Sequence, residues 1–223
     1  MPDRYPIGSH VIGNVPEKHI AVYGGSFNPP TLAHLFIADS ATLLENVDEV
    51  WMIPAYKHRF KGNNTVDAQR YSHILSMLGL CTAPMSNVAV KETEYTYSKL
   101  NADYDGSTYE LLSYLNSLYP DYEFSIIIGQ DNADDIKKWK HWEKLVNEYR
   151  FIIVDRNTGD ENSDFPGMIH ERICNTMYLD VSSSKARAIL STHGSFTEEM
   201  EDELNTLLPK SVIHYILHEG TMI

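Results

Sequence analysis

The chain has 223 residues, with 18 Lys and Arg against 31 Asp and Glu, so its formal net charge is −13 when histidine is counted as neutral. Hydrophobic residues make up 43% and charged residues 22%, a balance typical of a globular protein with a buried core. The acidic balance argues against nucleic acid or an anionic membrane as a partner, because both require a basic face. A small anionic ligand remains compatible, since it needs only a few local donors.

Cysteine usage and the ends of the chain indicate the compartment. Cys81 and Cys174 are far apart in the sequence and have no Cys or His nearby at ligand spacing, which argues against a disulfide framework and a zinc site. No apolar run approaches the about 18 residues of a membrane helix. Residues 1–18 lack the pattern of a secretory signal, so we expect a cytoplasmic protein. We predict a loose N-terminal arm at 1–18 and a single domain at 19–223.

Along the chain, short β-branched runs alternate with amphipathic segments. The pattern predicts strands at 19–23, 49–53, 88–91, 124–128, 150–154 and 177–179. It predicts helices at 31–45, 67–80, 107–118, 132–139, 142–147, 183–192 and 209–218, and a surface loop at 157–166. This alternation predicts an α/β fold: a doubly wound, Rossmann-like parallel sheet with helices on both faces and a C-terminal helical portion. Ligands are expected beyond the carboxyl ends of the strands.

The first candidate site follows the first predicted strand, which ends in Gly24 and Gly25. Glycine after a strand lets backbone N–H groups approach a phosphate closely. His34 falls in the first turn of the next helix, where the helix dipole favours an anion and an imidazole can donate to it. The alternative is an ordinary strand–turn–helix corner with a core histidine. The segment lacks the spacing of a P-loop and of a dinucleotide fingerprint, so Walker-type ATP hydrolysis and nicotinamide-dependent redox chemistry lose their main support.

The second candidate site lies at the predicted start of helix 183–192. Ser182, Ser183 and Ser184 offer hydroxyls and free N–H groups at a helix start, and Arg187 lies one turn after Ser183 on the same face. A helix N-terminus, hydroxyls and a guanidinium together suit an oligophosphate. A serine cap beside a surface arginine is the simpler alternative. Two such helix starts in one sheet protein favour a substrate with several phosphates.

These segments resemble signatures of the nucleotidyltransferase superfamily. The run Gly25-Ser26-Phe27-Asn28-Pro29-x-Thr31-x-x-His34 looks like its (H/T)xxH signature, and Val181-Ser182-Ser183-Ser184-x-x-Arg187 resembles its ISSTxxR motif. Residues 107–112 (STYELL), 128–132 (IGQDN) and 139–145 (WKHWEKL) make the chain similar to nicotinate or nicotinamide mononucleotide adenylyltransferases, from about residue 20 to the C-terminus. Thr31 stands where many members have a first histidine, and Ser184 replaces the usual threonine.

The resemblance implies that ATP and a pyridine mononucleotide are joined to give the dinucleotide and pyrophosphate, in NAD biosynthesis. Mg²⁺ is expected on the ATP phosphates, with no metal site built from protein side chains. The implied catalytic residues are His34, Lys61 and Arg187. The implied ATP-binding residues are Gly24, Gly25, Ser26, Phe27, Gly129, Asp131, Ser183 and Ser184. The implied mononucleotide-binding residues are Thr108, Trp139, Trp142 and Arg156.

Several assignments stay open at the level of sequence. The family's loop usually ends Pro-Pro-His-Lys, whereas residues 57–61 read KHRFK here, so Lys57 is the alternative to Lys61. Asp131 and Thr108 also suit helix caps, either tryptophan suits core packing, and Arg156 suits a plain surface position. Rival functions are a phosphopantetheine adenylyltransferase or a cytidylyltransferase of the same superfamily, or a non-catalytic nucleotide-binding regulator. The choice between nicotinate and nicotinamide and the existence of a homo-oligomer are also left open.

Overall fold

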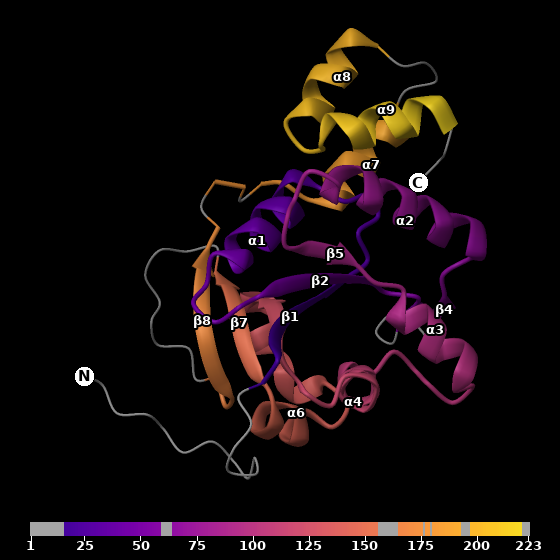
Figure 1. Cartoon of the computed structure of the whole chain (residues 1–223). Helices are drawn as coiled ribbons and strands as arrows, with labels where there is room; N and C mark the ends of the chain where they lie inside the picture. The colour runs from indigo at the N-terminus through magenta and orange to yellow at the C-terminus, as the bar shows by residue number, and fades with distance from the viewer. Residues whose placement is uncertain are drawn as a thin grey trace.

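A parallel sheet of six strands forms the centre of the protein (Figure 1). The computed structural model describes residues 16–58, 64–155, 165–175, 177–178, 180–192 and 197–219. The sheet has the order β5-β2-β1-β6-β7-β8, and every neighbouring pair is parallel. The strands are β1 (Lys18–Gly25), β2 (Glu49–Pro54), β5 (Val88–Val90), β6 (Tyr122–Gly129), β7 (Arg150–Asp155) and β8 (Met168–Cys174). A separate antiparallel pair joins β3 (Lys57–His58) to β4 (Asn64–Thr65).

The order of the strands confirms the predicted doubly wound fold. Chain connections run outward from β1 in one direction through β2 and β5, and in the other through β6, β7 and β8. In such sheets the crevice for a ligand opens beyond the carboxyl ends of the two central strands, where the direction of winding reverses. Here these strands are β1 and β6, and Tyr23 pairs with Ile127 near the end of both. The predicted phosphate turn therefore lies where this fold binds ligands.

Helices cover both faces of the sheet, with two hydrophobic clusters between them and the strands. Successive β1 side chains alternate: Ile20 and Val22 belong to one cluster, Ala21 and Tyr23 to the other. The first of these clusters is covered by α4 (Thr108–Leu118), α5 (Gln130–Asp134), η2 (Ile136–Lys138) and α6 (Trp142–Glu148). The second is covered by α1 (Leu32–Thr42), α2 (Ala68–Thr82), α7 (Ser183–Thr192), α8 (Glu198–Asn205) and α9 (Lys210–Glu219), with α3 (Thr93–Leu100) at its margin.

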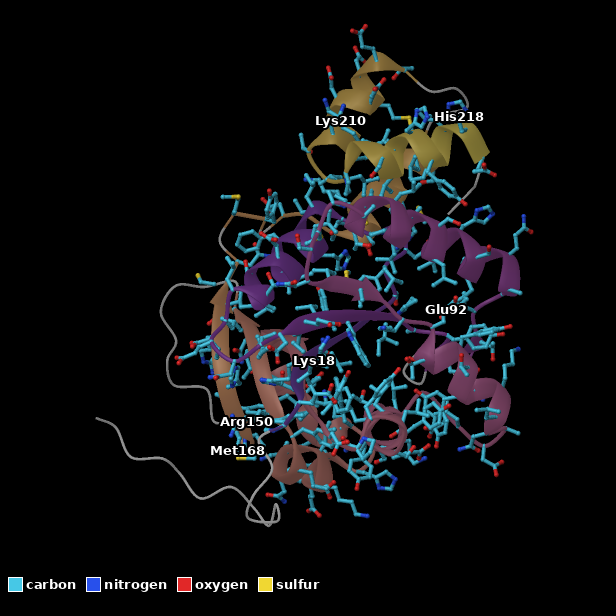
Figure 2. The ribbon with its side chains drawn as sticks, in the orientation of Figure 1. Lys18, Glu92, Arg150, Met168, Lys210 and His218 are labelled. Carbon is cyan, nitrogen blue, oxygen red and sulfur yellow. The ribbon has the colours of Figure 1, made fainter. Side chains whose placement is uncertain are left out.

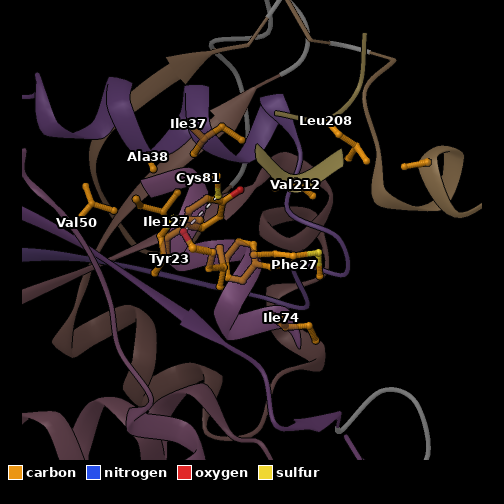
Figure 3. Close-up of a cluster of buried hydrophobic side chains, with 14 of the residues drawn as sticks. Tyr23, Phe27, Ile37, Ala38, Val50, Ile74, Cys81, Ile127, Leu208 and Val212 are labelled. Atoms are coloured by element: carbon orange, nitrogen blue, oxygen red, sulfur yellow. Dashed lines mark hydrogen bonds between the residues drawn. The ribbon is translucent and has the colours of Figure 1, made fainter. Parts of the chain in front are cut away.

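The C-terminal helices α8 and α9 pack on the same side of the sheet as α1 and α2 (Figure 1). The backbone N–H of Leu32, at the start of α1, donates to the carbonyl of Leu207 at 2.9 Å. Leu208 and Val212 join the buried cluster that contains Phe27 (Figure 3). The predicted C-terminal helical portion is thus part of the domain core, and it braces the turn that follows β1.

The opposite edge of the sheet lies away from these helices. Arg150 and Met168 are the first residues of β7 and β8, and Figure 2 shows them far from Lys210 and His218 of α9. In the described part of the chain no helix is both long enough and apolar enough to cross a membrane.

Most predicted elements are confirmed with small shifts at their ends, and one prediction is wrong. The strand predicted at 177–179 does not exist at 177–178, where the chain forms a turn; the last strand of the sheet is β8. The Oδ1 atom of Asn175 accepts the N–H of Tyr178, and the carbonyl of Tyr178 accepts the N–H of Val181, which closes that turn. The elements β8, α3, α8, β3 and β4 were not predicted. Most of the predicted loop at 157–166 lies outside the described residues.

Candidate active site

The turn between β1 and α1 leaves open space at one glycine and none at the other. A Cβ atom on Gly24 would meet nothing within 4 Å, whereas one on Gly25 would lie 2.9 Å from Cζ of Phe27. Phe27 has a positive φ of 43° and a side chain only 1% exposed. Its ring packs edge-on against Tyr23 and His34, with centroids 5.4 and 5.1 Å apart. Phe27 therefore offers a ligand only its backbone, and its ring fixes the shape of the turn.

His34 is held by the residue that caps its own helix. Thr31 is the N-cap of α1 and fully buried; its hydroxyl accepts the N–H of His34 at 3.4 Å and lies 2.9 Å from Nδ1 of the ring. The backbone N–H of Thr31 donates to the same Nδ1 at 3.0 Å. An amide N–H can only donate, so Nδ1 is the acceptor and the neutral ring carries its proton on Nε2. Thr31, in place of the first histidine of the signature, fixes this tautomer.

Burial also sets the charge of His34. It lowers the pKa of the imidazole to about 4, because a charged ring is costly away from water. The ring is therefore neutral near pH 7 and acts as a hydrogen-bond donor through Nε2. His34 is half-buried and packs against Phe27, as the core interpretation expects, while its role toward a phosphate stays a prediction.

The second motif lies directly against this turn. Nη1 of Arg187 donates to the carbonyl oxygen of Asn28 at 2.6 Å, and Nη2 donates to Oγ of Ser184 at 3.0 Å. The hydroxyl of Ser183 donates to the carbonyl oxygen of Pro29 at 2.8 Å. The start of α7 and the turn after β1 are thus joined by side-chain to backbone hydrogen bonds, which we call the clasp. Arg187 thus contacts the turn at Asn28, six residues before His34, which lies in the first turn of α1.

The end of β6 carries Gly129 and Asp131. A Cβ atom on Gly129 would lie 2.5 Å from Oδ1 of Asp131, so this carboxylate folds back over the strand end. The cap alternative for Asp131 is wrong, since Gly129 is the N-cap of α5 and that position has no side-chain cap bond. The cap alternative for Thr108 is wrong as well, because Ser107 is the N-cap of α4. Asp131 is an exposed carboxylate beside the central crevice.

The remaining predicted residues fall into two groups. Trp139 and Trp142 are partly buried and pack against the cluster under α4 and α6, so each contributes to the core while keeping part of its surface. Arg156 and Lys61 lie outside the described residues. Lys57, the alternative loop lysine, is described: its ammonium donates to the carbonyl of Ala102 at 3.4 Å and to that of Tyr104. The ammonium of Lys57 is thus engaged by the loop that precedes α4.

A residue that the sequence analysis missed supports the same region. Glu94 of α3 is 7% exposed, and its Oε1 accepts the backbone N–H groups of Tyr56 and Lys57, both at 2.9 Å. Burial raises the pKa of this carboxyl to about 7. Glu94 therefore anchors the segment after β2 from which the basic stretch 57–61 departs. A lone glutamate in a Thr- and Tyr-rich segment gives no pattern that could have identified it.

The comparisons with known proteins agree with this geometry. A family model described as cytidylyltransferase-like matches residues 22–189. Curated relatives named "probable nicotinate-nucleotide adenylyltransferase" include one from Anaeromyxobacter, 29% identical over 91% of this chain and 96% of that protein, and one from Streptococcus pyogenes, 29% identical over 92% and 88%. A solved structure of the Plasmodium falciparum nicotinic acid mononucleotide adenylyltransferase complexed with NaAD superposes with a TM-score of 0.71, at 25% identity, over 92% of this chain and 98% of that one. By the length of the family match and the fold it shares, this chain belongs to the cytidylyltransferase-like family.

Proposed function

We propose that this protein transfers the adenylyl group of ATP to a pyridine mononucleotide, with nicotinate mononucleotide as the favoured acceptor. The observation that supports the proposal is the clasp: it holds Ser183 and Arg187 of one motif against the turn that leads to His34 of the other, after the carboxyl end of a central strand of the sheet. The names of the curated relatives and of the Plasmodium structure support nicotinate as the acceptor.

The reaction is an in-line displacement at the α-phosphorus of ATP. An oxygen of the mononucleotide's 5′-phosphate forms the new P–O bond, and the bond from the α-phosphorus to the bridging oxygen breaks, which releases pyrophosphate. A phosphate is already an anionic nucleophile, so no general base is required. Catalysis then consists of positioning two polyanions and stabilising the charge that develops on the phosphates. This matches a site that offers donors and no nucleophile–base pair.

The role of each ATP-side residue follows from its placement. Nε2–H of His34 donates to the α-phosphate as charge builds there. Backbone N–H groups of Gly24, Gly25 and Phe27, with the hydroxyl of Ser26, meet the neighbouring phosphate oxygens. Arg187 keeps N–H donors beyond those used in the clasp. With the hydroxyl of Ser184 and the backbone N–H groups of Ser183 and Ser184 at the start of α7, it holds the β- and γ-phosphates.

The remaining roles concern the nucleosides and the metal. Asp131 accepts hydrogen bonds from ribose hydroxyls, while Thr108, Arg156 and one of Trp139 and Trp142 contact the mononucleotide. Since the ammonium of Lys57 is engaged, Lys61 is the better candidate for the lysine that screens the two substrates. Among the described residues no three His, Cys, Asp or Glu side chains form a group that could hold a metal. This suits Mg²⁺ that arrives bound to the ATP phosphates and neutralises part of their charge.

Pyrophosphate release tests the proposal. The protein is incubated with ATP and, in separate reactions, nicotinate mononucleotide, nicotinamide mononucleotide, phosphopantetheine or buffer alone. Release with a pyridine mononucleotide, together with the matching dinucleotide on chromatography, supports the proposal. Release only with phosphopantetheine would place the activity elsewhere in the superfamily. Binding of ATP by calorimetry without release from any acceptor would identify a regulator instead.

A further inference from the structure

Three charged side chains at the base of α4 form a compact group that the reaction above does not use. Nζ of Lys140 lies 2.6 Å from Oε1 of Glu110 and 3.2 Å from Oδ2 of Asp105. The side chains of Lys140, Asp105 and Glu110 are 30%, 24% and 23% exposed, so water screens them only in part. We call these three residues the Lys140 cluster. Nε2 of His141 lies 3.8 Å from Oε1 of Glu110.

The topology places this cluster at the same edge of the sheet as the crevice. The helix α4 leads into the start of β6, and α6 leads into the start of β7, so both helices begin at the carboxyl edge. The lysine of the cluster lies between η2 and α6, and its two acids flank the start of α4. The cluster therefore ties together two segments that border the crevice.

The cluster is also interleaved with the candidate mononucleotide residues. Thr108 lies between the two acids in the sequence, and Trp139 and Trp142 stand on either side of the lysine. A pyridine ring held by these residues would carry its acid or amide group in the field of the cluster. One ammonium and two carboxylates leave a net charge of −1.

The two pyridine mononucleotides differ in the charge of this group. Nicotinate carries a carboxylate, whereas nicotinamide carries a neutral amide, so a fixed charge nearby acts on one and hardly on the other. Taking the proposed function as its basis, we propose that Lys140 shifts the preference between the acid and the amide mononucleotide toward the acid. Lys140 is the residue that keeps the acid acceptable, by offsetting one of two neighbouring carboxylates.

A purely structural role of the ion pairs makes a different prediction. Breaking a structural tie would lower the affinity for both acceptors alike, and removing both partners would be no better than removing one. The charge effect depends instead on the sum, which is −2 in Lys140→Met, 0 in Glu110→Gln and again −1 in the double variant.

The experiment compares kcat/KM for nicotinate and nicotinamide mononucleotide, and their Kd by calorimetry, in the wild type and these three variants. The preference ratio, acid over amide, should fall roughly tenfold in Lys140→Met and rise by a similar factor in Glu110→Gln, because a unit change in nearby charge acts on the carboxylate of the acid and hardly on the neutral amide. The double variant should return to near the wild-type ratio. Lys138→Met is the matched control, because it removes a lysine two residues away whose pair with Asp135 is exposed. Its ratio should stay unchanged.

The outcomes separate the inference from the function beneath it. If the wild type neither binds nor uses either mononucleotide, the proposed function fails and the inference falls with it. If the wild type is active but the preference ratio changes in the same direction in all three variants, or changes most in the double variant, the cluster is only a structural tie. The inference alone is then overturned. Thermal unfolding of every variant establishes that a changed ratio is measured on folded protein.

Discussion

His34 combines two roles that substitution can separate: its Nδ1 closes the cap of α1, and the resulting tautomer leaves Nε2–H as a donor for the proposed reaction. His34→Ala removes both. Loss of one donor to a developing charge costs about 100- to 1,000-fold in turnover, or about 3 to 4 kcal/mol of transition-state stabilisation. His34→Gln places an amide N–H near the position of Nε2, and His34→Asn places its amide near the position of Nδ1.

We therefore expect different losses from the two amides. His34→Gln should lose about tenfold in kcat, because a donor remains, although the N–H of Thr31 loses its acceptor. His34→Asn should keep more of the helix cap, worth about 1 kcal/mol in thermal stability, yet be nearly as inactive as His34→Ala. The assay is pyrophosphate release at saturating ATP, with circular dichroism to confirm folding.

The pH profile adds an independent check on His34. Burial lowers the pKa of this imidazole to about 4, so it is already neutral at pH 6 and its protonation should not shape kcat/KM between pH 6 and 8. Because this histidine binds a proton more readily in the unfolded chain than in the folded one, acid also weakens the fold. The free energy of unfolding should fall as the pH drops from about 6.5, the unfolded pKa, through about 4, the folded pKa. A limb near pH 6.5 that disappears in His34→Gln would refute the neutral-donor reasoning. So would turnover of His34→Ala within threefold of the wild type.

Three changes test residues of the site and its surroundings. Arg187→Met should raise the KM for ATP at least about tenfold with folding retained, and Arg187→Lys should recover only part of the loss, because an ammonium lacks the planar fork of a guanidinium. Initial rates over a range of ATP concentrations measure both KM values, and an unchanged KM would remove Arg187 from the ATP site. Burial raises the pKa of Glu94 to about 7, so the free energy of unfolding of the wild type should fall by about 1 kcal/mol from pH 6 to pH 8 as the buried carboxyl ionises. In Glu94→Gln this loss should be absent. Urea unfolding at the two pH values measures both, and an equal change in the wild type and the variant would contradict the prediction. Gly25→Ala should lower the free energy of unfolding by about 1 to 3 kcal/mol, because its Cβ would lie 2.9 Å from the Phe27 ring. Gly24→Ala should unfold like the wild type, because its Cβ would meet nothing within 4 Å. Equal melting temperatures for the two variants would count against the geometry of the turn.

Five strands of the sheet, including the edge strand β5, were predictable from the sequence because their runs are short and apolar, whereas the other edge strand, β8, was not. The strand β8 contains His170, Glu171 and Arg172 and is mostly exposed, so it lacks a buried-strand signal. The apolar run at 177–179 resembles a strand, but hydrogen bonds closed by Asn175 bend its start into a turn. The helix α3 is rich in Thr and Tyr, which favour strands, and it buries Glu94 rather than an apolar stripe.

The candidate site, too, was predictable from the sequence only in part. Each candidate phosphate motif could be picked out from the sequence, because a glycine turn and a serine-rich helix start are local patterns with a direct chemical meaning; that they bind phosphate stays a prediction. The hydrogen bond from Arg187 to Asn28 was not, since the two residues are 159 positions apart and no periodicity links them. The Lys140 cluster likewise depends on how α4 and α6 pack, which no local pattern encodes. Sequence indicates which residues carry the chemistry, and the packing decides which of them meet.

The clasp has a consequence for the order in which this protein is made. Its two halves are separated by 154 and 159 residues, so the ribosome completes the glycine turn about ten seconds or more before it completes α7. During that interval the nascent chain contains His34, whereas Arg187 has not yet been made. If the proposed function holds, a chain that ends before α7 should bind ATP weakly, and the clasp completes the site only near the end of translation.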